Sequence, residues 1–141
     1  MASLIYDSFL DDNAKGNIVW SGAQSFKMML VTATYAAGKG THLTRNDVTN
    51  EVTGTNYTTG GVAVGFTLAK DGTNHWETVT FASPTTYTNL TVSNIRAGVI
   101  YKTTGTASTD LLVCYVDFGA NYSPSAQNFQ VSFTSPLKWA N

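Results

Sequence analysis

The chain has 141 residues, of which 43% are hydrophobic and only 12% are charged, and its formal net charge is −1. This length predicts a single domain, 1–141, that buries about two-thirds of the surface its unfolded chain exposes. The eight lysines and arginines are scattered singly, whereas binding to nucleic-acid phosphates needs clustered positive charge. No run approaches the roughly 20 apolar residues of a membrane span, and Met1–Asp7 lacks the features of a signal peptide. We therefore expect neither a nucleic-acid nor a membrane partner.

The best helix candidate lies near the N-terminus, at Ile5–Lys15. Ile5, Phe9 and Leu10 recur there at helical spacing. Gly16 follows at a position where helices often end in a left-handed residue. A helix this short needs packing against a sheet to persist.

The next stretch alternates between strands and turns. Ile18–Trp20 is a candidate short strand, and the apolar run Phe26–Thr32 predicts a longer one. Thr44–Asn50 opens with the Ser/Thr-x-x-acid form of a capping box, which predicts one or two helical turns. Gly54–Gly61 is rich in turn residues and predicts a long connection.

From Val62 to Ala69 the apolar residues alternate with small and polar ones, which predicts a half-buried strand. Asp71-Gly72 then signals a hairpin that returns the chain through His75–Phe81. Phe129–Phe133 is a last alternating strand, and Pro136–Asn141 is interpreted as a tail with an aromatic residue near its end.

Two apolar runs, Ile95–Lys102 and Leu111–Phe118, are joined by a polar loop and predict a central antiparallel hairpin. Leu111–Val116 is apolar on both faces, so we expect it to lie inside a sheet that is covered on both sides, with Cys114 buried as an inert thiol. About seven short strands separated by turns favour an all-β fold. We expect an antiparallel β-sandwich or barrel-like domain with short helical additions near the N-terminus.

Candidate catalytic residues do not converge on any known pattern. His42 and His75 show no zinc-site spacing and no nucleophile motif accompanies them. Asp117 interrupts an apolar strand, which favours a buried, hydrogen-bonded turn anchor. Asp7, Asp11 and Asp12 could in principle bind calcium, but solvent-exposed acids on a short helix are the better explanation of this group. We therefore expect no enzymatic activity, no cofactor and no metal.

Five blocks together resemble a family of small structural proteins of tailed bacteriophages. These blocks are Phe26–Thr32, Thr44–Val52, Gly54–Gly61, Ala97–Lys102 and Tyr115–Gly119. The resemblance implies a non-enzymatic virion component, assembled in the bacterial host cytoplasm and bound to other virion proteins in several copies. A head decoration or cement protein on the capsid surface is the first expectation, and a neck or tail component, such as a collar or adaptor, is the alternative.

A low content of charge suits a surface that packs against neighbours, because little desolvation cost opposes the contact. The N-terminal segment, the loop Leu43–Gly61 and the C-terminal tail are the expected contact regions with other virion proteins. We also expect the protein to form a homo-oligomer. The interface candidates are Tyr6, Phe9, Leu10, Arg45, Tyr57, Leu137 and Trp139. A different class of function, a carbohydrate-binding β-sandwich, stays open because several aromatic residues fall in or beside loops and could stack on sugars.

Overall fold

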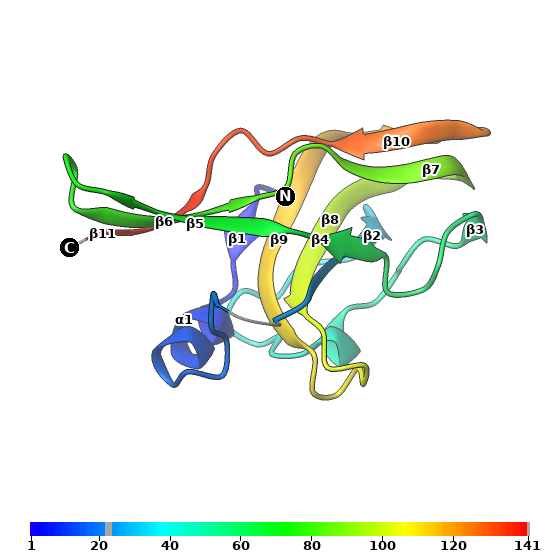
Figure 1. Ribbon diagram of the computed structural model, residues 1–141. Helices are drawn as coiled ribbons and strands as arrows, with labels where there is room; N and C mark the ends of the chain where they lie inside the picture. The colour runs from blue at the N-terminus through cyan, green and yellow to red at the C-terminus, as the bar shows by residue number, and fades with distance from the viewer. Residues whose placement is uncertain (22–23, 141) are drawn as a thin grey trace.

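The computed structural model describes residues 1–21 and 24–140, which form antiparallel sheets and one short helix (Figure 1). In chain order the elements are β1 (Leu4–Ile5), α1 (Asp7–Ala14), β2 (Phe26–Thr32), a 3₁₀ turn (Arg45–Asp47), β3 (Gly54–Thr55), β4 (Val62–Val64), β5 (Phe66–Asp71), β6 (Trp76–Phe81), β7 (Thr85–Val92), β8 (Ile95–Lys102), β9 (Leu111–Tyr122), β10 (Gln127–Val131) and β11 (Leu137–Ala140). The all-β, sandwich-like fold class is thereby confirmed.

The strands form three antiparallel sheets. The largest has the order β1-β9-β8-β2-β4, and the two smaller sheets have the orders β10-β7-β3 and β11-β6-β5. Figure 1 shows β7 and β10 lying across β8 and β9, while the β5–β6 hairpin and β11 extend to one side. The predicted hairpins β8–β9 and β5–β6 are both present.

The large sheet is buried on both faces because its strands alternate between two apolar clusters. In β2, Phe26 and Met28 face the cluster that the smaller sheets cover, whereas Met29 and Val31 face the opposite cluster. The second cluster is closed by Tyr6 and by Tyr35, Ala37 and Val48, which lie between β2 and β3. Burial on two sides explains why β2, β8 and β9 are nearly continuous apolar runs.

A β-bulge adjusts which side chains of β9 face each cluster. The register with β8 shifts between Ile100 and Tyr101, so that one extra residue of β9 is accommodated there. As a result Val113 and Cys114 belong to one cluster, and Leu112 belongs to the other. The expectation that this strand is covered on both sides is confirmed.

Cys114 provides a direct test of that burial. Its side chain is in the core, and burial raises the pKa of the thiol to about 12. We expect Cys114→Ser to lower the free energy of unfolding by about 1 to 3 kcal/mol, because the new hydroxyl would be buried without a good partner. Chemical denaturation measures this loss, and Cys114→Ala is the control that removes the sulfur without adding a hydroxyl. Rapid labelling of the native thiol would contradict the prediction.

The N-terminal region differs from the predicted helix in its bounds. Ile5 belongs to β1 and pairs with Cys114, and α1 then runs over Asp7–Ala14. Gly16 has the predicted positive φ, at 77°. The prediction of a strand at Ile18–Trp20 was wrong: Ile18 and Trp20 lie in bends, and the Ile18 side chain is buried in the core.

The capping box of Thr44 and Asp47 is present, but it supports only a single 3₁₀ turn at Arg45–Asp47. Val48 leaves this turn with an extended backbone, so the predicted helical turns stop before Asn50. Backbone hydrogen bonds join this short turn to the segment that immediately precedes β9. Arg45 N–H donates to the Asp110 carbonyl oxygen at 2.9 Å.

Two other expectations are corrected at the edges of the sheets. The predicted strand Val62–Ala69 is interrupted at Gly65, so that β4 pairs with β2 and β5 pairs with β6. The C-terminal tail is a strand: Leu137–Ala140 forms β11 and pairs with β6 along four residues. The last alternating strand, β10, ends at Val131 before Phe133.

Candidate functional site

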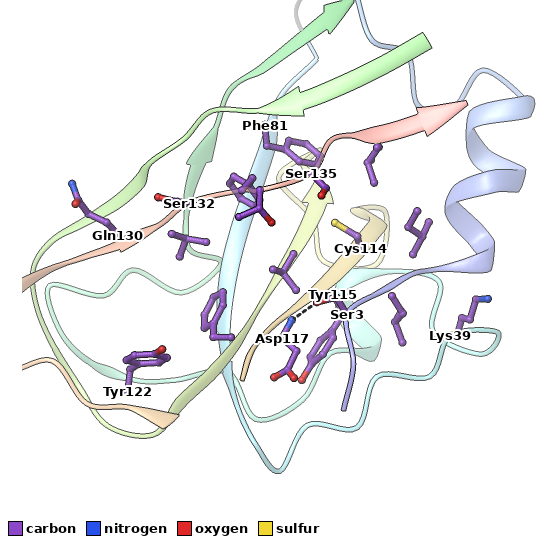
Figure 2. A pocket seen from close by; sticks show the side chains of 18 of the residues that line it. Ser3, Lys39, Phe81, Cys114, Tyr115, Asp117, Tyr122, Gln130, Ser132 and Ser135 are labelled. Atoms are coloured by element: carbon purple, nitrogen blue, oxygen red, sulfur yellow. Dashed lines mark hydrogen bonds between the residues drawn. The ribbon is translucent and has the colours of Figure 1, made fainter. Parts of the chain in front are cut away.

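A groove opens where the large sheet and β10 leave a gap between them. Its volume is about 1030 Å³, and residues 3–5, 114–118 and 129–135 line most of it. We call this groove the seam. Figure 2 shows Cys114 and Phe81 beside its inner wall, Lys39 toward one end, and Tyr122 and Gln130 toward the other. The seam therefore runs along β9 and β1 on one side and along β10 and the segment that follows it on the other.

The seam carries exposed apolar surface. Leu10 is 56% exposed, Tyr122 is 43% exposed and Ile5 is 36% exposed, and all three line the groove. Phe118 and Phe129, which contact each other at the Tyr122 end, are only partly buried. A concentration of large apolar side chains along one groove is typical of a contact surface.

The charges along the seam are already paired within the chain. Arg96 donates to both carboxylate oxygens of Asp117, at 2.7 and 3.2 Å. This hydrogen-bonded ion pair holds the pKa of Asp117 below its usual value. At the opposite end Lys39 Nζ lies 3.6 Å from Asp7 Oδ1. A molecule that occupies the seam would therefore need no charge of its own.

Asp117 is hydrogen-bonded, as expected for a turn anchor, but it is only partly buried and lies within β9. Its carboxylate accepts the Gly119 N–H at 3.3 Å, and Gly119 has a positive φ of 78°. The Asp117 N–H donates to Ser3 Oγ at 2.9 Å, which fastens the N-terminal segment to β9. The ion pair with Arg96 had no signal in the sequence, because the two residues are 21 positions apart.

Three of the interface candidates face the interior, and this is a correction. Tyr6 is fully buried, and its hydroxyl lies 2.9 Å from the Tyr35 hydroxyl. Phe9 is buried on the helix face that contacts the core. Tyr57 is partly buried, and its hydroxyl accepts the Leu30 N–H and donates to Glu51. Each serves the chain's own packing and offers little or no surface to a partner in this conformation.

The remaining candidates are distributed between the seam and the interior contacts. Leu10 and Leu137 line the seam. Trp139 lies on β11, where its ring is 5.9 Å from that of Trp20. The N-terminal segment and the segment interpreted as a C-terminal tail therefore both pair with the chain's own sheets, as β1 and β11. Arg45 is bound to a buried carboxylate.

That carboxylate belongs to Asp110, which the sequence analysis did not single out. Its side chain is completely buried, and Arg45 Nε lies 2.7 Å from its Oδ2. Thr104 contributes its backbone N–H at 2.6 Å and its hydroxyl at 3.0 Å. Burial alone would raise the pKa of Asp110, but these hydrogen bonds outweigh burial and leave the pKa lowered. The position of Asp110 directly before an apolar strand was the one sequence feature that could have indicated its structural role.

Arg45 lies at the start of segment 44–61, and a second carboxylate, that of Glu51, holds the end of this segment. Glu51 accepts the Gly60 N–H at 2.6 Å and the Tyr57 hydroxyl at 2.7 Å. The Tyr101 hydroxyl donates to the Gly60 carbonyl oxygen, and the Arg45 guanidinium lies 5.3 Å from the centre of the Tyr101 ring. Burial raises the pKa of Tyr101 to about 12. Segment 44–61 is thus fixed to the large sheet by polar contacts, which indicates a structural role for these charges.

The candidate catalytic residues stay apart from one another. His42 Nδ1 lies 2.9 Å from the Tyr35 hydroxyl, whereas His75 sits in the β5–β6 loop with a positive φ. Within residues 1–21 and 24–140, no three His, Cys, Asp or Glu side chains gather where they could share a metal ion. In the same residues, no helix has the length and apolar character to span a membrane.

The chain matches none of the protein-family models, characterised proteins or solved structures with which it was compared.

Proposed function

We propose that this protein is a non-enzymatic structural component of a tailed-bacteriophage virion. It decorates or cements the head by binding the capsid surface in several copies. The observation that carries the proposal is the seam, a large groove with exposed apolar side chains and internally paired charges. The resemblance of the five sequence blocks to phage structural proteins supports the choice of a virion over other assemblies.

The seam suits permanent assembly better than capture of a small solute. Its volume of about 1030 Å³ is at the upper end of the roughly 300 to 1,000 Å³ of small-molecule pockets. Exposed Tyr122 is of the aromatic type that dominates binding energy in protein interfaces, and exposed Leu10 adds apolar area beside it in the same groove. Repetition of a modest contact around a symmetric shell would add avidity.

Mass spectrometry of purified particles of the phage that encodes the chain tests this proposal. The protein should be present in many copies per particle, and electron microscopy of particles labelled with an antibody should place it on the head. Label confined to the neck or tail would favour the alternative position. Purified virions without this chain would overturn the proposal.

A surface variant tests whether the seam is the contact. Leu10→Ser should weaken retention on particles about tenfold, because it removes an exposed anchor from the groove while leaving the core intact. Leu68→Ser is the matched control, since Leu68 is 45% exposed on β5, away from the seam. Equal loss for both variants, measured by sedimentation of particles with bound protein, would exclude the seam.

The carbohydrate-binding alternative has one observation in its favour. A smaller hollow of about 450 Å³ is lined by Trp20 and Trp139 together with Asn13 and Glu77. Indole rings beside amide and carboxylate groups are suited to stacking on a sugar and bonding its hydroxyls. A glycan array decides between the two functions: specific binding that Leu10→Ser leaves unchanged would favour the carbohydrate reading.

A further inference from the structure

A chain of hydrogen bonds runs from the core to the partly exposed ring of His42. The Tyr6 hydroxyl lies 2.9 Å from the Tyr35 hydroxyl, which in turn lies 2.9 Å from His42 Nδ1. The Gly38 N–H donates to the same nitrogen at 3.3 Å. A backbone N–H can only donate, so Nδ1 carries no proton in this arrangement and the neutral ring is protonated on Nε2.

Both hydroxyls keep their protons, and this sets the direction of the chain. Burial raises the pKa of Tyr6 and that of Tyr35 above the ordinary value. Tyr35 therefore donates to His42 Nδ1 and accepts the proton of Tyr6. The single lone pair of Nδ1 is shared between Tyr35 and the Gly38 N–H, and the Tyr35 hydroxyl is the closer donor. The whole arrangement depends on a neutral imidazole.

The segment that carries His42 also holds the start of α1. The helix has no side-chain cap, and its first N–H, that of Asp7, donates to the Lys39 carbonyl oxygen at 2.9 Å. The Ser8 hydroxyl donates to the His42 carbonyl oxygen at 3.3 Å, and Asp7 Oδ1 lies 3.6 Å from Lys39 Nζ. We call segment 38–42 the clasp. Its conformation decides whether the first turn of α1 has these partners.

We propose that the clasp is a pH-sensitive switch, which is closed while His42 is neutral and opens when the ring is protonated. A proton on Nδ1 would point at the Gly38 N–H, and two donors directed at each other repel. Tyr35 would have to accept from the ring, so the Tyr6–Tyr35 pair would hold one hydroxyl proton more than the chain can accept. Histidine gains its charge between about pH 8 and pH 5, and solvent reaches this ring. The inference concerns this chain alone and does not depend on the proposed virion function.

The other titratable groups around the clasp favour the open state once the ring is charged. Backbone N–H groups of the capping box and, to a lesser extent, His42 hold the pKa of Asp47 below its usual value. Asp47 is therefore an anion that attracts a protonated ring. Asp7 and Lys39 offset each other as an ion pair, and burial raises the pKa of Tyr115, whose ring packs beside the chain, so that it stays neutral.

The test follows the Gly38 amide of the full-length protein by NMR-detected hydrogen exchange. Its protection factor, which is corrected for intrinsic exchange, should fall at least about fivefold between about pH 8 and pH 5, as expected when one ordinary hydrogen bond is lost. The Asp7 amide should lose protection over the same range, with the midpoint at which the His42 ring titrates. At about pH 8 the nitrogen shifts of His42 should show the proton on Nε2.

His42→Asn separates the switch from the structure, because the asparagine Oδ1 can accept in place of Nδ1 but does not titrate. This variant should keep the Gly38 amide protected across the whole range. His75→Asn is the matched control: it removes the histidine of the β5–β6 loop, where asparagine tolerates the positive φ of 59°, and should keep the wild-type response. Protection of Gly38 that does not change with pH, a proton on Nδ1 at about pH 8, or a wild-type response in His42→Asn would overturn the proposal.

Discussion

Asp110→Ala should lower the free energy of unfolding by about 3 to 5 kcal/mol, because it removes one partner of a buried ion pair. The Asp110 side chain has no exposed surface, and that of Arg45 is only 19% exposed. Without the carboxylate, the guanidinium and the Thr104 N–H lose their acceptor in a site that water reaches poorly. The loss should also loosen segment 44–61, since Arg45 connects its first turn to the start of β9.

Urea denaturation measures the loss, and Asp117→Ala is the matched control. Asp117 also binds an arginine through two oxygens, but both side chains of that pair are more exposed, at 26% for Arg96 and 14% for Asp117. Solvent can therefore replace part of the lost interaction, and we expect a smaller decrease than for Asp110. A decrease below about 1 kcal/mol for Asp110→Ala would place its ion pair among ordinary surface pairs.

The same carboxylate should make the protein sensitive to acid. The folded-state pKa of Asp110 is lowered from 3.8, so its stabilising contribution is present above that value and is lost as the pH falls through the folded pKa. Asp47 is shifted in the same direction by the Thr44 and Leu43 N–H groups. Stability should therefore decline below about pH 4, and Asp110→Asn should decline less steeply than the wild type. Parallel pH profiles would contradict this role.

The strands with continuous apolar sequence were predictable, and the edge strands were not. β2, β8 and β9 are recognisable in the sequence as continuous apolar runs, because they supply apolar side chains to both faces of the large sheet. β1 and β11 have too few residues to carry a periodic signal, and each exists because a longer strand offers it a partner. Gly65 looked like a small residue in an alternating strand, yet the chain changes sheets there.

The candidate site was predictable in part. Leu10 and Leu137 were expected at a contact surface and do line the seam. The groove itself joins residues 3–5 with residues far along the chain, so no local pattern could reveal it. Tyr6 and Phe9 were predicted to lie at an interface but are buried in the core. The sequence cannot separate the two cases, because an apolar residue near a terminus has the same sequence pattern whether it faces the core or a partner.

Gly61→Ala should lower the free energy of unfolding by about 4 kcal/mol, from backbone strain and steric overlap together. Gly61 has a positive φ of 78°, and a Cβ there would overlap the Met28 carbonyl oxygen in β2. That oxygen belongs to rigid backbone in the middle of the core, so it cannot move aside cheaply. The glycine is what allows the chain to pass from the Glu51-anchored loop into β4, which pairs with β2.

Gly105→Ala separates the two contributions. Gly105 also has a positive φ, at 93°, but no atom lies within 4 Å of the position that its Cβ would occupy. We therefore expect this control to lose only about 1 kcal/mol, the cost of placing alanine in a left-handed conformation. Thermal and urea denaturation of both variants measure the difference. Losses of similar size would mean that strain alone governs both sites, and that β2 does not approach the loop as closely as the structure indicates.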